Sequence, residues 1–183
     1  MAAWRSRTGG VYALTTFASI LPGHKDELQA YLDAMPIAEQ SPLARLEQLH
    51  LSRIHIFDEL VAQPGHAAEK LDAPQLVFTS SFDGPLDRYL DDICDKVPEA
   101  DEWWGHCVGY PGRADKAAFR AYVRAHQVDA QLFANAYHGK TVQDVKRALA
   151  NRDRVIDFAA QANGLDAAEL LQRFRSEFAG VAR

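Results

Sequence analysis

Polar side chains that can bind or transform a small molecule recur at alternate positions in three stretches, residues 47–57, 75–82 and 130–138. They are Arg53, His55, Thr79, Ser81, Asn135 and Tyr137. We expect each stretch to be a strand, because apolar, β-branched or aromatic residues dominate it. Alternate residues of a strand share a face, so the sequence predicts that these side chains converge in an otherwise apolar pocket.

Arg53 and His55 are the candidate catalytic residues of this set. A guanidinium can hold a carboxylate or a phenolate, and an imidazole can transfer a proton near neutral pH. The other polar residues of the set would hydrogen-bond the substrate. The alternative is that Arg53 and His55 bond across a dimer interface or face solvent, since a register shift of one residue reverses every assignment.

The stretch DEWWGHCVGYPG, residues 101–112, is the second place of interest. Trp103, Trp104 and Tyr110 carry large apolar surfaces that a loop can bury over a core, over a pocket mouth or against a partner. The final Tyr-Pro-Gly is typical of a type II turn. We expect a lid or dimer-contact loop, in which these three aromatic residues close the pocket over a substrate.

Histidines provide candidate cofactor ligands. His106, inside that stretch, and His126, at the end of an apolar helical face, are the residues that would serve as an axial haem ligand. A structural role is the alternative for both, and a core histidine is the more usual explanation for His126. No metal site is predicted, because the seven histidines show no ligand spacing, and we expect His24, His66 and His138 at the surface.

Acidic residues form one regular row. Asp87, Asp91 and Asp95 recur every fourth residue and so share one face of a predicted helix. Such a row can bind a cation, but a solvated helix face is the more usual explanation.

The elements that must position these side chains follow the order strand, helix, strand, strand, helix, strand. This order is typical of the ferredoxin-like βαββαβ fold, which belongs to the α+β class. We expect a loose tail over residues 1–10 and a ferredoxin-like domain over 11–140, with an insertion at 98–129 before the last strand. A helical extension is expected over 141–183.

Two segments carry a resemblance to known proteins, VYALTTFASILPGHKDELQAYLDAM and QLVFTSSFDGPLDRYLDDI. In both, a strand with small hydroxyl residues turns through Pro-Gly or Gly-Pro into an amphipathic helix, and over about residues 11–150 the chain resembles the dimeric α/β-barrel superfamily. LVFTSSFDG, WWGHCVGYPG and AYVRAHQ together resemble a mostly uncharacterised bacterial family within it. The resemblance implies a four-stranded sheet that pairs with a partner's sheet into a barrel. Its members include cofactor-free monooxygenases, haem peroxidases and plain stress proteins, so the fold alone selects no reaction.

Composition narrows the classes of partner. The chain has 183 residues and a formal net charge of −5 with no basic stripe, which argues against nucleic acid as a partner. No apolar run approaches the length of a membrane span, and two cysteines without a secretory signal favour the cytoplasm.

We therefore expect a cytoplasmic homodimer that is a small-molecule enzyme. Its predicted class is an oxidoreductase of monooxygenase or peroxidase type, acting on a small apolar molecule in the barrel, either with haem or with no cofactor. The competing expectation is a non-catalytic small-molecule-binding or assembly module of the same fold. A shared, solvent-excluded pocket around Arg53 and His55 favours the enzyme, and an outward orientation favours the module.

Overall fold

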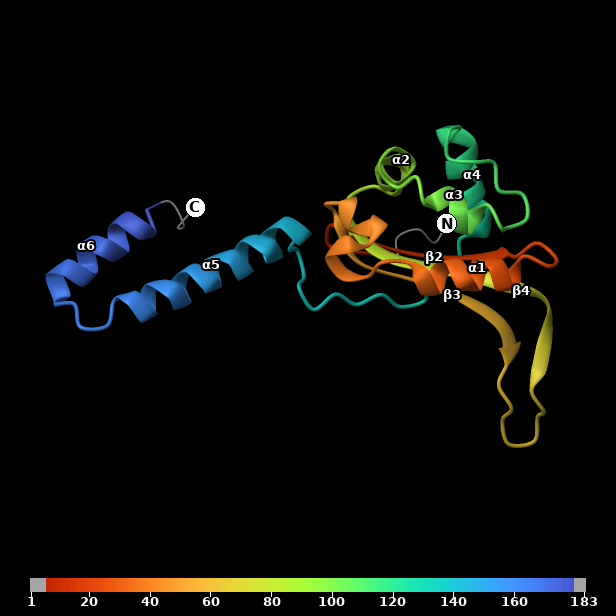
Figure 1. Cartoon of the computed structure of the whole chain (residues 1–183), viewed down its shortest axis with the longest axis horizontal. Coiled ribbons are helices and arrows are strands. Elements are labelled where there is room, and N and C mark those ends of the chain that lie inside the picture. The colour runs from red at the N-terminus through yellow and green to blue at the C-terminus, as the bar shows by residue number, and fades with distance from the viewer. Residues whose placement is uncertain (1–5, 180–183) are drawn as a thin grey trace. The chain divides into compact units, whose positions relative to one another are not determined.

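The computed structural model describes residues 6–179, and the chain divides after Val142 into two compact units. The larger unit is an α+β structure built on a four-stranded antiparallel sheet (Figure 1). In the sheet order β1-β2-β4-β3, the strands are β1 Arg7–Thr8, β2 Val11–Ser19, β4 Glu69–Asp83 and β3 Leu49–Leu60. The strands predicted over residues 11–20, 47–57 and 75–82 are therefore confirmed as β2, β3 and β4.

The helices of the larger unit form one side of the hydrophobic core. They are α1 Lys25–Ala34, α2 Leu86–Lys96, α3 Ala100–Trp104 and α4 Lys116–His126, with two short 3₁₀ turns at Ala38–Gln40 and Pro42–Arg45. The predicted order of strand, helix, strand, strand and helix is thus present from β2 to α2. Leu28 of α1, Leu90 of α2 and Phe119 of α4 are buried in the same apolar cluster.

One face of the sheet packs against these helices. Tyr12, Leu14 and Ala18 of β2 alternate along the strand and are buried in the core cluster with Phe78 and Phe82 of β4. The alternate residues of each strand point to the other side, which we call the outer face. On β3 these are Leu51, Arg53 and His55, and all three are exposed. The inner face therefore carries the apolar core, as the strand periodicity requires.

The predicted fourth strand over residues 130–138 is wrong, since this segment has no strand structure. Asn135 Oδ1 accepts a hydrogen bond from the backbone N–H of Tyr137, a local bond that competes with strand pairing. The free edge of β2 is instead covered by three short segments. The bonds run from Ala13 N to Ser6 O, from Val128 N to Thr15 O and from Val108 N to Ser19 O, at 2.8, 2.9 and 2.8 Å.

The chain before Val11 also differs from the expected loose tail. Ser6 is fully buried, and Arg7–Thr8 form β1, which pairs with Val11 and Tyr12 of β2. Residues 1–5 of that predicted tail lie outside the described residues. Edge pairing by β1 explains the difference, because an unpaired edge of β2 would leave backbone donors and acceptors without partners.

The smaller unit begins at Gln143 and contains the rest of α5, Val142–Gln161, and all of α6, Ala167–Glu177. Asp166 caps α6 by accepting hydrogen bonds from two backbone N–H groups of its first turn, at 2.9 and 3.0 Å. The rings of Phe158, Phe174 and Phe178 pack together and join the two helices. None of the described helices is both long enough and apolar enough to cross a membrane.

Candidate functional site

The sheet brings four of the predicted site residues to the outer face. Arg53 of β3 lies directly opposite Thr79 of β4, His55 lies opposite Val77, and Ser81 lies opposite Leu51. Because directly paired residues of an antiparallel sheet point to the same side, Arg53, His55, Thr79 and Ser81 form one polar set. The predicted face of these residues is therefore the one that the structure has, but Arg53 and His55 are exposed on it.

Asn135 and Tyr137 do not join this set through a strand. The segment that holds them is irregular, and the side chain of Asn135 bonds the backbone of Tyr137. Tyr137 is 64% exposed. The prediction that placed both residues on a fourth strand is therefore wrong, because it took a turn-forming Asn for part of an alternating pattern.

One buried hydroxyl on the outer face has no hydrogen-bond partner in the part of the chain that the structure describes. This hydroxyl is Oγ1 of Thr79. A buried hydroxyl without a partner costs about 1–3 kcal/mol. Arg53 and Ser81 flank this position on a face that also carries Leu51 and Phe17, 52% and 39% exposed.

The two tryptophans belong to the core, not to a lid. Trp103 and Trp104 lie in α3 and are almost completely buried. The Trp104 ring packs edge-to-face on Phe78 and Phe119, with centroid distances of 5.1 and 5.2 Å. The predicted loop is therefore wrong for these two residues. Their bulk is used to fill the space between β4 and α4, so neither can close a pocket.

Tyr110 lies in the irregular segment after α3, and its hydroxyl makes a hydrogen bond within the protein. It donates a hydrogen bond to Asp101 Oδ1 at 2.6 Å, and the backbone N–H of Arg113 donates to the same oxygen at 3.1 Å. Burial, together with the Asp101 carboxylate, raises the pKa of Tyr110 far above its usual range. Gly112 has a φ of +82°, the positive value that the predicted turn requires at this position. Tyr110 thus ties the turn to α3.

The two candidate haem ligands have different surroundings. His126 Nδ1 lies 2.8 Å from the carbonyl oxygen of Tyr122, and the two rings are 4.3 Å apart. That arrangement fits the structural role, although Nε2 remains available to a ligand. His106 lies on the turn after α3, where its Nδ1 contacts a second histidine. Haem ligation by either residue stays a prediction.

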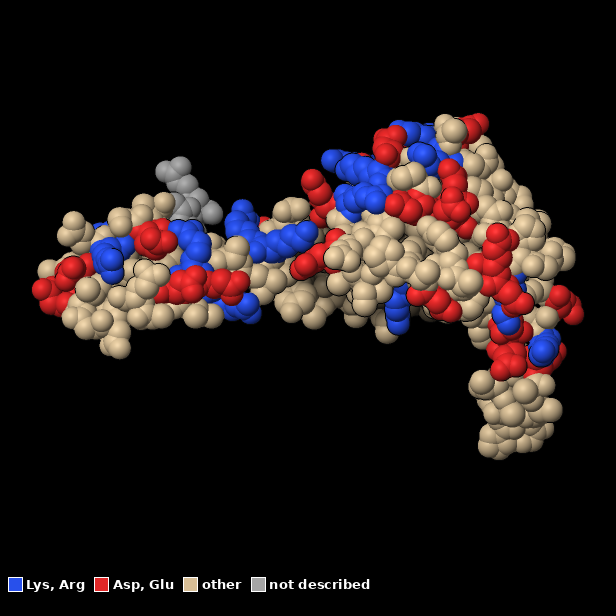
Figure 2. All heavy atoms as spheres, in the orientation of Figure 1, with Lys and Arg blue, Asp and Glu red and all other residues tan. Residues whose placement is uncertain are grey.

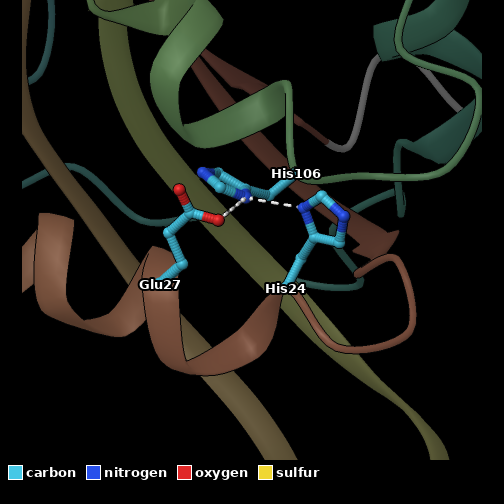
Figure 3. Close-up of side chains that lie close together, drawn as sticks. All are labelled: His24, Glu27 and His106. Carbon is cyan, nitrogen blue, oxygen red and sulfur yellow. Dashed lines mark hydrogen bonds and ion pairs between the residues drawn. The ribbon is translucent and has the colours of Figure 1, made fainter.

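Figure 3 shows the contact that His106 makes with His24 and Glu27. Nδ1 of His24 and Nδ1 of His106 are 3.0 Å apart, and an oxygen of Glu27 lies 4.0 Å from Nδ1 of His106. The three potential ligand atoms all lie within 4.8 Å of one another. Two imidazoles and one carboxylate are a donor set that transition-metal ions accept.

Sequence reasoning missed this cluster, because it assigned His24 to the surface and treated His106 alone. One signal was available. His24 and Glu27 are three residues apart at the start of a predicted helix, so they face the same side. What the sequence did not contain was the pairing of the His106 turn with the end of β2, which brings residues 82 positions apart into contact.

Neither Cys94 nor Cys107 supplies a nucleophile or adds a thiolate ligand to the imidazole and carboxylate groups described above. Burial raises the pKa of Cys94 to about 11 and that of Cys107 to about 12. Cys107 Sγ points to the carbonyl oxygen of Trp103, 3.8 Å away inside the core. Both side chains are therefore neutral thiols at physiological pH.

The acidic row of α2 is matched by basic residues of α4. The ion pairs are Asp87–Arg124, Asp91–Arg120 and Asp95–Lys116, with N–O distances of 2.6, 2.9 and 2.6 Å. Figure 2 shows acidic and basic side chains mixed over these helices. The row is therefore half of an interhelical ladder and has no excess negative charge with which to hold a cation.

A cavity of about 310 Å³ opens on the helix side of β3. Its lining is apolar apart from two serines and consists of Leu32, Met35, Pro36, Ile37, Ala38, Ser41, Leu43, Ser52 and Ile54. Ser52 and Ile54 alternate with Arg53 along β3, so the cavity and the predicted catalytic pair lie on opposite faces of the sheet.

Comparison with other proteins found no match. No family model matches the chain, and no curated protein and no solved structure matches it either. The resemblance to the dimeric α/β-barrel superfamily therefore stays a prediction.

Proposed function

We propose that this protein is a small-molecule enzyme, an oxidoreductase that binds an apolar, anionic or phenolic substrate on the outer face of its sheet. The observation that supports the proposal is the convergence of Arg53, His55, Thr79 and Ser81 on that face. Arg53 would hold the negative end of the substrate, and His55 would transfer a proton. The unpartnered hydroxyl of Thr79 would donate or accept one hydrogen bond.

The proposal requires a second copy of the chain. Arg53 and His55 are exposed in one chain, and catalysis by proton transfer gains from exclusion of water. A partner's sheet laid on the outer face would supply that exclusion and would also bury Leu51 and Phe17, the large apolar residues exposed there. Three of the four strands, in the order β2-β4-β3, have the neighbours that a ferredoxin-like sheet requires.

A fluorescent probe tests the binding step. 8-Anilinonaphthalene-1-sulfonate combines an apolar ring system with an anion, which is the chemistry expected of the ligand. Arg53→Gln should weaken its binding about tenfold, whereas Arg88→Gln, which removes an exposed arginine from α2, should leave it unchanged. Equal affinity in both variants would remove Arg53 from the proposal.

The reaction class is tested by consumption of dioxygen or hydrogen peroxide with a panel of phenols and quinols. We expect turnover that His55→Gln abolishes and that His66→Gln, at the exposed tip of the β3–β4 hairpin, retains. Haemin added to the same samples tests the cofactor. A Soret band that disappears in His106→Ala or His126→Ala would identify a haem ligand.

The second candidate function is a non-catalytic small-molecule-binding or assembly module. The exposure of Arg53 and His55 on the outer face favours it, because the pair lacks a closed pocket within one chain. Probe binding that depends on Arg53, combined with no turnover on any substrate of the panel, would establish this reading. Light scattering on the purified chain separates the two further, since the enzyme requires a dimer.

A further inference from the structure

The contact between His24, Glu27 and His106 lies away from the outer face and has a chemistry of its own. His24 is the N-cap residue of α1, yet its side chain makes no capping hydrogen bond. Instead, the ring points toward His106, as Figure 3 shows. Glu27, one turn further along α1, extends toward the same His106 ring.

The backbone holds the His106 side of the cluster in place. The carbonyl oxygen of His106 accepts a hydrogen bond from Leu21 N at 2.8 Å, and Cys107 pairs with Ile20 in an isolated β-bridge. These links attach the turn to the end of β2 just before α1 begins. Because His106 itself is largely buried, its ring has few alternative positions, so half of the cluster is preorganised.

The distance between the two rings fits a shared metal ion. Two imidazole nitrogens bound to one ion at about 2.0–2.1 Å, with bond angles of about 90–110°, lie about 2.8–3.4 Å apart. The observed Nδ1–Nδ1 distance is 3.0 Å. Glu27 is 73% exposed, so its side chain can rotate to bring an oxygen from 4.0 Å into bonding distance without disturbing the core.

A hydrogen bond between two neutral imidazoles would also place the nitrogens 3.0 Å apart. Such a bond accounts for the short distance between His24 and His106, but it gives the nearby Glu27 carboxylate no role. The start of a helix repels a cation, and here the two acidic residues of the first turn, Asp26 and Glu27, offset that effect. The positive charge of Lys25 is paired with Asp58 and does not oppose a bound ion directly.

We propose that His24, Glu27 and His106 bind one divalent first-row transition-metal ion, such as Zn²⁺, Fe²⁺ or Co²⁺. Imidazole nitrogen favours these ions over Mg²⁺ and Ca²⁺, which prefer sites built from oxygen alone. Three protein ligands would leave at least one coordination position of such an ion open. This set would bind a water molecule or a small anion there, which makes the centre suited to chemistry as well as to structure.

Metal binding is measured directly, without any substrate. The full-length protein is stripped with a chelator and titrated with Zn²⁺ by calorimetry, and with Co²⁺ by visible absorption. We expect one ion per chain, with affinity reduced at least hundredfold in His24→Gln and in His106→Gln. Glu27→Gln should weaken binding about tenfold. His66→Gln, an exposed histidine of the β3–β4 hairpin, is the matched control and should bind as the parent protein does.

Three outcomes would overturn the proposal: no binding to the stripped parent protein, binding that survives in the His24→Gln/His106→Gln double variant, or equal losses in the His66→Gln control. Survival in the double variant would identify an adventitious ion only. Glu27→Gln guards against a folding artefact, since its side chain is largely exposed and its removal leaves the core intact. The outer-face proposal is unaffected by any of these results, because its probe responds to Arg53.

Discussion

The two faces of the sheet are made by the same strands and differ in almost every physical property. The inner face is covered by aromatic and aliphatic side chains that pack on the helices, and Trp104 contacts both Phe78 of β4 and Phe119 of α4. The outer face alternates with it residue by residue and carries Arg53, His55, Thr79 and Ser81. The inner face therefore determines stability, and the outer face is available for binding.

Among changes to the two faces, removal of the Trp104 side chain should have the largest effect on stability. Trp104→Ala leaves a cavity between β4 and α4 and should lower the free energy of unfolding by about 3–5 kcal/mol. Leu51→Ala, at an exposed position of the outer face, should cost about 0.5 kcal/mol or less in a monomer. Urea unfolding measures both. A large cost for Leu51→Ala would show that the outer face is covered in solution, as a dimer requires.

The second-largest effect is expected from alkaline pH, which should lower the free energy of unfolding through groups buried in the core. Burial raises the pKa of Cys94 to about 11, whereas the thiol of the unfolded chain has an ordinary value near 9. Between these values the folded protein retains a proton that the unfolded chain has lost, so stability falls as pH rises, by up to about 1.4 kcal/mol per pH unit. The buried Tyr89 hydroxyl, whose pKa is also raised, acts in the same direction.

Thermal unfolding between pH 8 and 11 checks this expectation. Cys94→Ala should show a shallower decline than the parent protein, because it lacks the titrating thiol. If both proteins lose stability equally over that range, Cys94 does not contribute, and other groups account for the alkaline loss.

The ladder between α2 and α4 should have the smallest effect. Asp91 and Arg120 are each about one-third exposed, and such ion pairs contribute about 0.2–1 kcal/mol. A double-mutant cycle with Asp91→Asn and Arg120→Gln measures the coupling, which should decrease at high salt. A coupling above about 2 kcal/mol would place this pair among the buried determinants of the helix layer.

Much of the larger unit could be predicted from periodicity. β2, β3 and β4 follow from alternation, and α1, α2 and α4 follow from apolar residues at i, i+3, i+4 and i+7, because a strand or helix must bury one face. The same alternation correctly placed Arg53 and His55 on one face of β3 and the apolar Ile54 and Ile56 on the other face. These features depend only on residues close to one another in the sequence.

Contacts between distant residues contributed to each of the failures. Residues 130–138 were predicted to be a strand, but Ser6 and β1 occupy the edge that it would have joined. Trp103 and Trp104 were predicted to lie in a lid or dimer-contact loop. No local pattern indicates that α4 packs against Trp104 through Phe119. An apolar residue demands burial, but only the packing of other elements decides where that burial occurs.

By itself, then, the sequence determined the three long strands β2, β3 and β4, most of the helices and which side chains of these strands share a face, since local periodicity is sufficient for these. The tertiary structure alone decided the meeting of His24 and Glu27 with His106. Those ligands come from the start of α1 and from a turn after α3, and only their backbone attachment to β2 brings the two rings to 3.0 Å.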